Sequence, residues 1–332
     1  MTSSPSSALS LRNLHKHFDA GRPGLLRRDD RLVHAVDGVD LDLGRGEILA
    51  LVGESGCGKS TLALTLLGLE RPTSGEMYFE GTDVARLRGA ALKDMHKRIQ
   101  MVFQDPYESL NPMMTIEEIV EEPLIVHRSF PTSDQRRARV IQALEDAGLK
   151  PADSFLDRLP HQLSGGQRQR VVIAASLVLD PTILLADEPV SMLDVSIRAE
   201  ILNLLADLRA RQGISILFIT HDFGTVAHFA DRIAVMYLGR IVEIGRTEEV
   251  LRAPRHPYTK ALLSVVPVPN PRLRQKRTIL QGETPNPIDL PTGCRFHPRC
   301  PIAEDRCRLT DPPAVTLSPS HSAACLLIEN DK

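Results

Sequence analysis

The sequence predicts an α/β fold built around a largely parallel sheet. Short apolar runs alternate along the chain with longer segments of helical periodicity, the order expected of strands joined by crossover helices. Residues 183–186 are apolar at every position and residues 214–219 nearly so, as in strands that are buried on both faces. The chain carries no convincing internal repeat, so we expect one copy of this core.

Length and charge limit the classes of protein to consider. A chain of 332 residues is long enough for a substantial core and two domains. Its 40 basic residues against 42 acidic ones argue against a protein that coats nucleic acid. The apolar stretch 171–179 is shorter than the ~18–20 residues that span a membrane. Residues 1–7 lack a basic start and an apolar block, so we expect no secretory signal.

The elements are expected in the following order. Residues 8–44 form short strands, because 11–18 and the alternating segment 39–43 both suit a half-buried strand. The basic insertion 21–31 between them is interpreted as a solvated loop. Further strands are expected at 76–79 and 99–103, mostly helix over 116–150 with a break at Pro131, and a helix over 194–211 that ends at Gly213.

A glycine-rich segment, residues 53–61, fits the phosphate-binding pattern G-x-x-x-x-G-K-[ST]. It lies between the apolar runs 48–52 and 62–67, which predicts a strand, a loop and a helix whose amino end faces the phosphates. Lys59 adds a positive charge, and the Ser60 hydroxyl can bind Mg²⁺. Cys57 is interpreted as a small filler. The predicted nucleotide-binding residues of this loop are Gly53, Ser55, Gly56, Cys57, Gly58, Lys59, Ser60 and Thr61.

Two carboxylates, Asp187 and Glu188, follow the apolar strand 183–186. They are expected at the carboxyl edge of the parallel sheet, where ligands bind in open α/β folds. There Asp187 suits a Mg²⁺ ion held through water, and Glu188 suits polarising an attacking water molecule.

Residues 163–167, Leu-Ser-Gly-Gly-Gln, resemble the signature of the ATP-binding cassette (ABC) family. The resemblance implies a P-loop ABC-type ATPase core with an antiparallel β subdomain and a helical subdomain. It also implies roles for single residues. Gln104 would contact Mg²⁺ or water, and His221 would contact the γ-phosphate. Asp194 would pack at the contact between the two subunits of a dimer, and Phe18 is the candidate to stack on adenine. The expected catalytic residues are Glu188, His221 and Gln104.

The signature carries a consequence for assembly. Ser164 and the glycines after it begin a helix with free N–H groups, which form an anion site. In the ABC family, Ser164, Gly166 and Gln167 would act on the nucleotide of a partner subunit. One P-loop and one signature therefore imply a dimer. The resemblance suggests a second, non-identical homologous ATPase, with a homodimer left open.

Longer blocks narrow the resemblance. Residues 104–112, 255–263 and 293–301 are similar to segments of the ATPases of oligopeptide and dipeptide importers. This implies the energy-coupling subunit of a di- or oligopeptide importer, closing on ATP and reopening after hydrolysis. It would lie on the cytoplasmic face of the membrane, peripheral to two transmembrane permease subunits and indirectly served by a substrate-binding protein. Nickel complexes, glutathione and other small solutes are alternative cargoes.

A soluble ABC ATPase acting on nucleic acid or ribosomes is the competing class. Such proteins usually have tandem cassettes, coiled-coil arms or a basic surface, and none is visible here. We therefore expect no nucleic-acid partner.

The chain divides into three expected regions. Residues 8–255 form the ATPase domain, with its helical subdomain at about 105–163. Residues 256–291, rich in proline, are an extended connector, because neither a helix nor a central strand tolerates that density. Residues 292–328 form a small C-terminal domain. Since this tail is separate from the P-loop, changes in it are expected to have small effects on ATP binding.

The tail carries Cys294, Cys300, Cys307 and Cys325. Four thiols in a short segment with little apolar content suggest that a metal centre holds it together. The resemblance implies a [4Fe–4S] cluster. A zinc site, with His297 or His321 replacing one ligand, and four reduced thiols are the alternatives.

Overall fold

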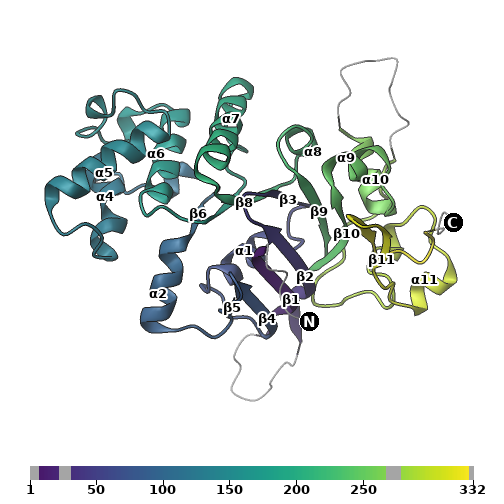
Figure 1. Cartoon of the computed structure of the whole chain (residues 1–332). Helices are drawn as coiled ribbons and strands as arrows, with labels where there is room; N and C mark the ends of the chain where they lie inside the picture. Colours follow the sequence, from purple (N-terminus) through teal and green to yellow (C-terminus); the bar gives the residue numbers. More distant parts are fainter. Residues whose placement is uncertain (1–6, 22–30, 267–277, 329–332) are drawn as a thin grey trace.

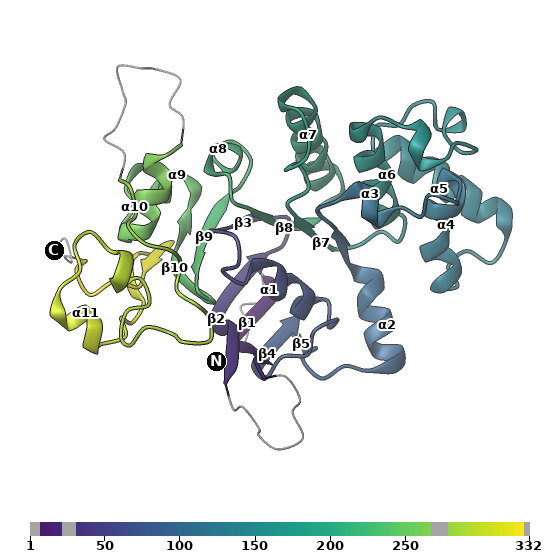
Figure 2. The ribbon, with the colours of Figure 1, turned by 180° about the vertical axis from the view of Figure 1, so that it is seen from behind.

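The computed structural model describes residues 7–21, 31–266 and 278–328. A helical part lies at one end of the molecule and the C-terminal part lies at the other, with the sheets between them (Figures 1 and 2). The α/β fold class is confirmed, together with its antiparallel and helical subdomains.

The main sheet has eight strands in the order β11-β12-β10-β9-β3-β8-β7-β6. Strands β9, β3, β8, β7 and β6 are parallel to one another, and β10, β12 and β11 extend the sheet from β9 in antiparallel fashion. Their bounds are β3 Ile48–Val52, β6 Ile99–Val102, β7 Ile183–Asp187, β8 Ser215–Thr220, β9 Arg232–Tyr237, β10 Arg240–Arg246, β11 Val315–Ser318 and β12 His321–Ala323.

The central strands are buried on both faces, as their apolar sequences predict. Every residue of β3, β7 and β8 is buried. Alternate residues face different cores: Leu184 and Phe218 pack in the core under the helical part, while Leu185 and Leu217 pack in the core beneath the second sheet. This alternation fixes the register of the parallel strands.

The second sheet is antiparallel, with the order β2-β1-β4-β5. Its strands are β1 Ser7–Asp19, β2 Leu32–Gly44, β4 Ser74–Phe79 and β5 Thr82–Asp83. Helix α1 (Lys59–Leu66) shares a core with this sheet and with the main sheet, through residues such as Leu11 and Leu62.

The helices of the helical part begin at side chains that cap them. Thr115, Thr132 and Ser164 each accept a hydrogen bond from the backbone three residues on, and the reciprocal Glu or Gln completes a capping box. The helices besides α1 are α2 Gly89–Arg98, α3 Pro106–Ser109, α4 Ile116–Val126, α5 Ser133–Asp146, α6 Gly165–Leu177, α7 Val195–Gln212, α8 Phe223–Val226, α9 Thr247–Arg252, α10 Pro257–Ser264 and α11 Asp305–Leu309.

Two expected irregular segments fall partly outside the described residues. Most of the insertion 21–31 does so, as do Pro267, Pro269 and Pro271 of the expected connector. The described part of the range 256–291 contains a helix, α10, in which Tyr258 is fully buried. A single proline at the start of a helix costs no hydrogen bond, which is why the segment at Pro257 is helical.

The C-terminal part is held to the cassette by apolar packing and ion pairs. Phe296 is 1% exposed, and its ring lies 5.3 Å from the rings of both Tyr237 and Tyr258. His321 of β12 contacts the buried carboxylate of Glu243, with Nε2 2.8 Å from Oε1. The tail therefore has an apolar anchor that its sparse hydrophobic sequence did not suggest.

The buried His256 makes the stability of this region depend on pH. Its Nδ1 accepts a hydrogen bond from the Tyr258 backbone N–H and so caps α10. Burial lowers the pKa of His256 to about 4. An unfolded histidine takes up a proton near pH 6.5, so the unfolded state binds more protons between these two values. The contribution of His256 to the free energy of unfolding is therefore complete above about pH 6.5 and is lost as the pH falls towards 4.

We predict that lowering the pH from 7 to 5 costs about 2 kcal/mol of unfolding free energy through His256 alone. The control is His256→Asn, which keeps a good capping side chain but does not titrate. Chemical denaturation at both pH values should show a smaller loss in this variant. Equal losses in the two proteins would contradict the assignment.

Candidate active site

The loop between β3 and α1 is folded for close approach of an anion. Gly58, before the first residue of α1, has a φ of 108°, and a Cβ there would lie 2.0 Å from the Ala35 carbonyl oxygen. Lys59 is 6% exposed, and its Nζ donates to the carbonyl oxygens of Gly53 (2.8 Å) and Glu54 (2.9 Å). A phosphate at the amino end of α1 would meet this charge together with backbone N–H groups.

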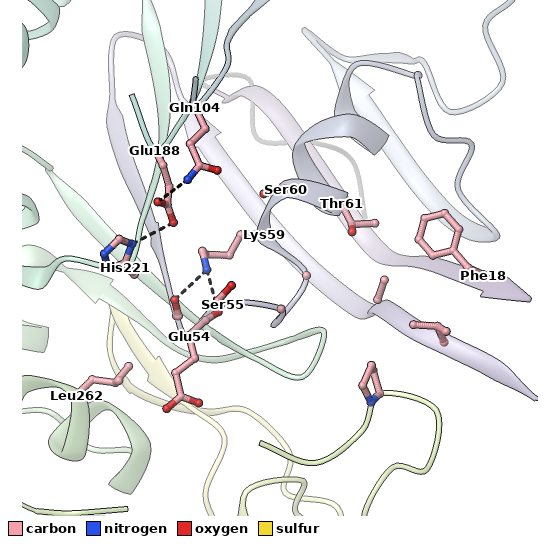
Figure 3. A pocket seen from close by; sticks show the side chains of 16 residues that line it. Phe18, Glu54, Ser55, Lys59, Ser60, Thr61, Gln104, Glu188, His221 and Leu262 are labelled. Atoms are coloured by element: carbon pink, nitrogen blue, oxygen red, sulfur yellow. Dashed lines mark hydrogen bonds and ion pairs between the residues drawn. The ribbon is translucent and has the colours of Figure 1, made fainter. Parts of the chain in front are cut away.

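A cavity of about 740 Å³ opens over this loop (Figure 3). The residues that line it are Phe18, Val33, Ala35, Gly53, Glu54, Ser55, Gly56, Gly58, Lys59, Ser60, Thr61, Gln104, Glu188, His221, Leu262 and Pro287. Of the loop residues expected to bind nucleotide, Cys57 is not in this lining. Its side chain is 1% exposed and packs in the core, and burial raises the pKa of its thiol, as suits a filler.

Three polar side chains meet at the ends of neighbouring strands (Figure 3). Glu188 follows β7, with Oε1 3.0 Å from His221 Nδ1 and Oε2 3.4 Å from Gln104 Nε2. Gln104 comes after β6, and His221 directly after β8. Because β6, β7 and β8 are parallel neighbours, their carboxyl ends place the three residues on one wall of the cavity.

Asp187, the last residue of β7, is 7% exposed, and its Oδ1 has no hydrogen-bond partner among the described residues. Burial raises the pKa of this carboxyl, while the Ser60 hydroxyl beside it acts in the opposite direction. A buried acceptor without a partner is costly. A hard cation held by Asp187, Ser60 and Gln104 would satisfy it, so these residues fit Mg²⁺.

Phe18, at the end of β1, lies on the cavity wall across from Glu188 (Figure 3). Val33, Ala35 and Pro287 also line the cavity, and the Lys16 ammonium lies 4.3 Å from the centre of the Phe18 ring. An apolar wall with an aromatic ring is the surface that a flat heterocycle needs for stacking.

The signature residues lie elsewhere. Ser164 caps α6, and Gln167 completes the capping box with its backbone N–H and side chain. Neither they nor Gly166 line the cavity, and the exposed Asp194 at the start of α7 does not line it either. The structure therefore brings together the P-loop residues, Gln104, Glu188, His221 and Phe18, and leaves Ser164, Gly166, Gln167 and Asp194 apart from them.

The sequence reasoning missed the contacts between the tail and the P-loop. Both carboxylate oxygens of Glu54 accept from Arg299, at 2.6 and 3.0 Å, and Thr284 donates to one of them at 2.9 Å. The backbone N–H of Glu54 donates to the Tyr258 hydroxyl at 2.9 Å. Contrary to the expectation of a separate tail, residues of α10, the connector and the tail thus touch the nucleotide loop. The sequence offered one signal for these contacts: Tyr258 and Arg299 lie in the blocks 255–263 and 293–301, which are similar to segments of peptide-importer ATPases.

The loop, the parallel strand ends and the cavity define a P-loop nucleotide-binding protein of the α/β class. Comparison with known proteins refines this. A family profile described as "ABC transporter" matches residues 36–191, and one described as "Oligopeptide/dipeptide transporter, C-terminal region" matches residues 242–307. The chain is 46% identical to the oligopeptide transport ATP-binding protein AppF of Bacillus subtilis, over 96% of this chain and 97% of that one. It is 47% identical to the dipeptide transport ATP-binding protein DppF of Haemophilus influenzae, over 95% of each.

Solved structures agree. The dimeric ATP-binding cassette MJ0796 bound to ADP and Pi matches with a TM-score of 0.63 and 32% identity, over 72% of this chain and 98% of that one. The cassette cbiO1 of Clostridium perfringens matches with a TM-score of 0.65 and 30% identity, over 75% and 92%. The chain belongs to the family of ABC transporter ATP-binding proteins, and it is an ATPase. None of the helices in the described ranges is long and apolar enough to cross a membrane.

The iron–sulfur cluster expected at Cys294, Cys300, Cys307 and Cys325 is wrong. The matching relatives are named as plain ATP-binding transport proteins, so no cluster is supported, and nothing supports zinc there either. The expectation rested on a tail with too little apolar content to hold together. In the structure that premise fails, because Phe296 is anchored in the core and β11 and β12 continue the main sheet.

The pair formed by Glu54 and Arg299 makes a prediction for nucleotide affinity. Arg299 and nearby groups lower the pKa of Glu54 in spite of its partial burial. Arg299→Met would leave an unpaired negative charge on the cavity wall. We predict about tenfold weaker ATP binding, the size of coupling typical of neighbouring groups.

Equilibrium titration with a fluorescent ATP analogue measures this effect. Adding Glu54→Gln to Arg299→Met should restore most of the affinity, because it removes the charge itself. Arg306→Met, in the exposed tail pair with Glu304, is the matched control and should leave binding unchanged. Unchanged affinity in Arg299→Met would show that the pair is only structural.

Proposed function

We propose that this chain hydrolyses ATP at the cavity over its P-loop to drive import of di- or oligopeptides through a membrane complex. The observation that carries the proposal is the contact of Glu188 with both Gln104 and His221 beside Lys59. Peptide cargo is supported by the names of the relatives and by the C-terminal region that the chain shares with peptide transporters.

The proposed roles follow from position. Lys59 and the backbone of Gly56 and Gly58 hold the phosphates, and Phe18 stacks on the base. Asp187, Ser60 and Gln104 would hold Mg²⁺, which would supply charge neutralisation at the phosphates. Glu188 orients and polarises the attacking water, and His221 holds Glu188 and the terminal phosphate in line.

We further propose that the site is completed by a second cassette. Ser164, Gly166, Gln167 and Asp194 do not reach the cavity of their own chain, yet the start of α6 presents N–H groups suited to a phosphate. The partner is proposed to be a homologous, non-identical ATPase. Two transmembrane permease subunits, and through them a substrate-binding protein, place the chain on the cytoplasmic face of the membrane. The unit that binds nucleotide is residues 8–255, with the tail 292–328 supporting it.

Glu188→Gln tests the role of the carboxylate. The amide keeps the shape of the side chain but cannot act as a base, so we predict unchanged ATP binding and turnover slower by ~10²–10⁴-fold. Phosphate release is measured in the assembled complex. Glu200→Gln is the control, because Glu200 is a half-exposed carboxylate on α7 that pairs with Arg170 of α6. Turnover within about threefold of the native rate in Glu188→Gln would remove Glu188 from the mechanism.

Dilution tests the need for a second cassette. We predict that the purified chain is a weak ATPase whose specific activity falls as it is diluted, and that activity rises with a homologous cassette and the permease subunits. Ser164→Arg in one chain should abolish hydrolysis at the partner's P-loop while leaving its own nucleotide binding intact. A constant specific activity on dilution would rule out a site completed in trans.

A further inference from the structure

Three histidines and an aspartate converge beside the nucleotide cavity. His15 Nδ1 and His17 Nε2 each lie 2.8 Å from Asp37 Oδ1. His34 Nδ1 lies 3.2 Å from His17 Nε2 and 3.7 Å from the same aspartate oxygen. Neither the P-loop nor the signature chemistry uses any of these four side chains. We call them the His₃Asp cluster.

The strand pairing explains how the sequence brings them together. His15 and His17 alternate with Lys16 along β1 and so share a face. Opposite them on β2, His15 pairs with Asp37 and His17 with His34. His34 and Asp37 are an odd number of residues apart and would face opposite sides of a regular strand, but the register shift after Lys16 turns both the same way.

With neutral imidazole rings, hydrogen bonding within the cluster is incomplete. His15 Nε2 lies 3.0 Å from the Asn13 side-chain oxygen, and in the tautomer that donates to this oxygen Nδ1 presents a lone pair to Asp37. In the same way, one proton on His17 Nε2 cannot serve both Asp37 and the facing His34 nitrogen. A metal ion between the donor atoms of His15, His17 and Asp37 would turn opposed lone pairs into ligands.

The spacing suits a tetrahedral ion. Bonds of about 2.0–2.1 Å to nitrogen and oxygen place neighbouring ligands about 3.3 Å apart in a tetrahedron. The ligand atoms of His15, His17 and Asp37 all lie within 4.8 Å of one another, with 2.8 Å from each histidine nitrogen to Asp37 Oδ1, which is the scale of one coordination shell. Imidazole nitrogens with one carboxylate favour Zn²⁺ over Mg²⁺ or Ca²⁺. We propose that His15, His17 and Asp37 form a zinc site, with the His34 ring beside it and the fourth position of the ion open to water.

The surrounding side chains orient these ligands. Asn13 fixes the ring of His15, and Arg295 binds the second carboxylate oxygen of Asp37, leaving Oδ1 for the ion. Arg240, 3.7 Å from Oδ2, adds a second positive charge that is itself paired with Asp311. The two arginines weaken binding of a cation, so a reversible site is expected.

The place of the cluster gives a bound ion a consequence. His17 directly precedes Phe18, and His34 lies between Val33 and Ala35. Phe18, Val33 and Ala35 all line the cavity. Asp37 also forms the ion pair with Arg295 that holds the tail to the ATPase domain. A zinc ion would therefore brace the wall where the base stacks and the attachment of the tail at the same time.

The test is metal binding by the purified full-length chain after removal of metal by a chelator. Calorimetric titration with Zn²⁺ should show one ion bound per chain. The expected Kd is below about 10 µM but well above that of a structural zinc site. Titration with Co²⁺ should give the visible absorption of a tetrahedral ion without the near-ultraviolet band of thiolate ligands, which separates this site from the tail cysteines.

Variants locate the ion. His15→Gln and His17→Gln should each weaken Zn²⁺ binding by at least about tenfold, since each removes one ligand. His228→Gln, an exposed histidine next to α8, is the matched control and should bind as the native chain does. The His15 side chain is 21% exposed, so His15→Gln keeps the test valid even where His17→Gln fails to fold.

Two results would overturn the proposal. Equal Zn²⁺ affinity in the native chain and in His15→Gln would place the ion elsewhere. No binding by the native chain would mean that protons alone hold the cluster together.

Discussion

The active site depends on the order of the parallel strands at the centre of the main sheet. With β3, β8, β7 and β6 side by side, the P-loop, His221, Glu188 and Gln104 emerge at one edge. Every residue of β3, β7 and β8 is buried, so a slip in register would move apolar side chains out of one core and into another. The geometry proposed for catalysis is therefore fixed by the same burial that stabilises the fold.

A second constraint links the C-terminal part to this edge. Arg299 and Arg295 of the tail each bind a carboxylate of the cassette, Glu54 in the P-loop and Asp37 in β2. Both arginine side chains are less than a tenth exposed, and breaking a buried pair leaves an uncompensated charge. With Phe296 packed against Tyr237 and Tyr258, these pairs make the tail an extension of the nucleotide-binding unit.

Much of the site could be predicted from the sequence because its residues follow recognisable strands. The loop 53–61, Glu188 and His221 each stand directly after an apolar run, so local pattern alone places them at the sheet edge. The pair of Glu54 with Arg299 joins residues 245 positions apart, and no periodicity points to it. How the tail is held could not be predicted for a similar reason. Phe296 is a single apolar residue in a polar segment, and its burial comes from tertiary packing. The His₃Asp cluster needed the register shift in β1 and β2, which a strand pattern cannot supply.

Two anionic side chains held by the tail flank the place where nucleotide binds, and this has a thermodynamic consequence. If the position of the tail changes the pairing of Glu54, it changes the charge that faces a bound phosphate. Linkage then requires the reverse: bound nucleotide must alter the stability of the tail's attachment by the same free energy. Through Asp37, the same reasoning extends to the wall that carries Phe18. Residues 292–328 would therefore need no chemistry of their own to influence hydrolysis, because Arg299 pairs with Glu54 on the wall of the proposed nucleotide site and Arg295 pairs with Asp37 of β2.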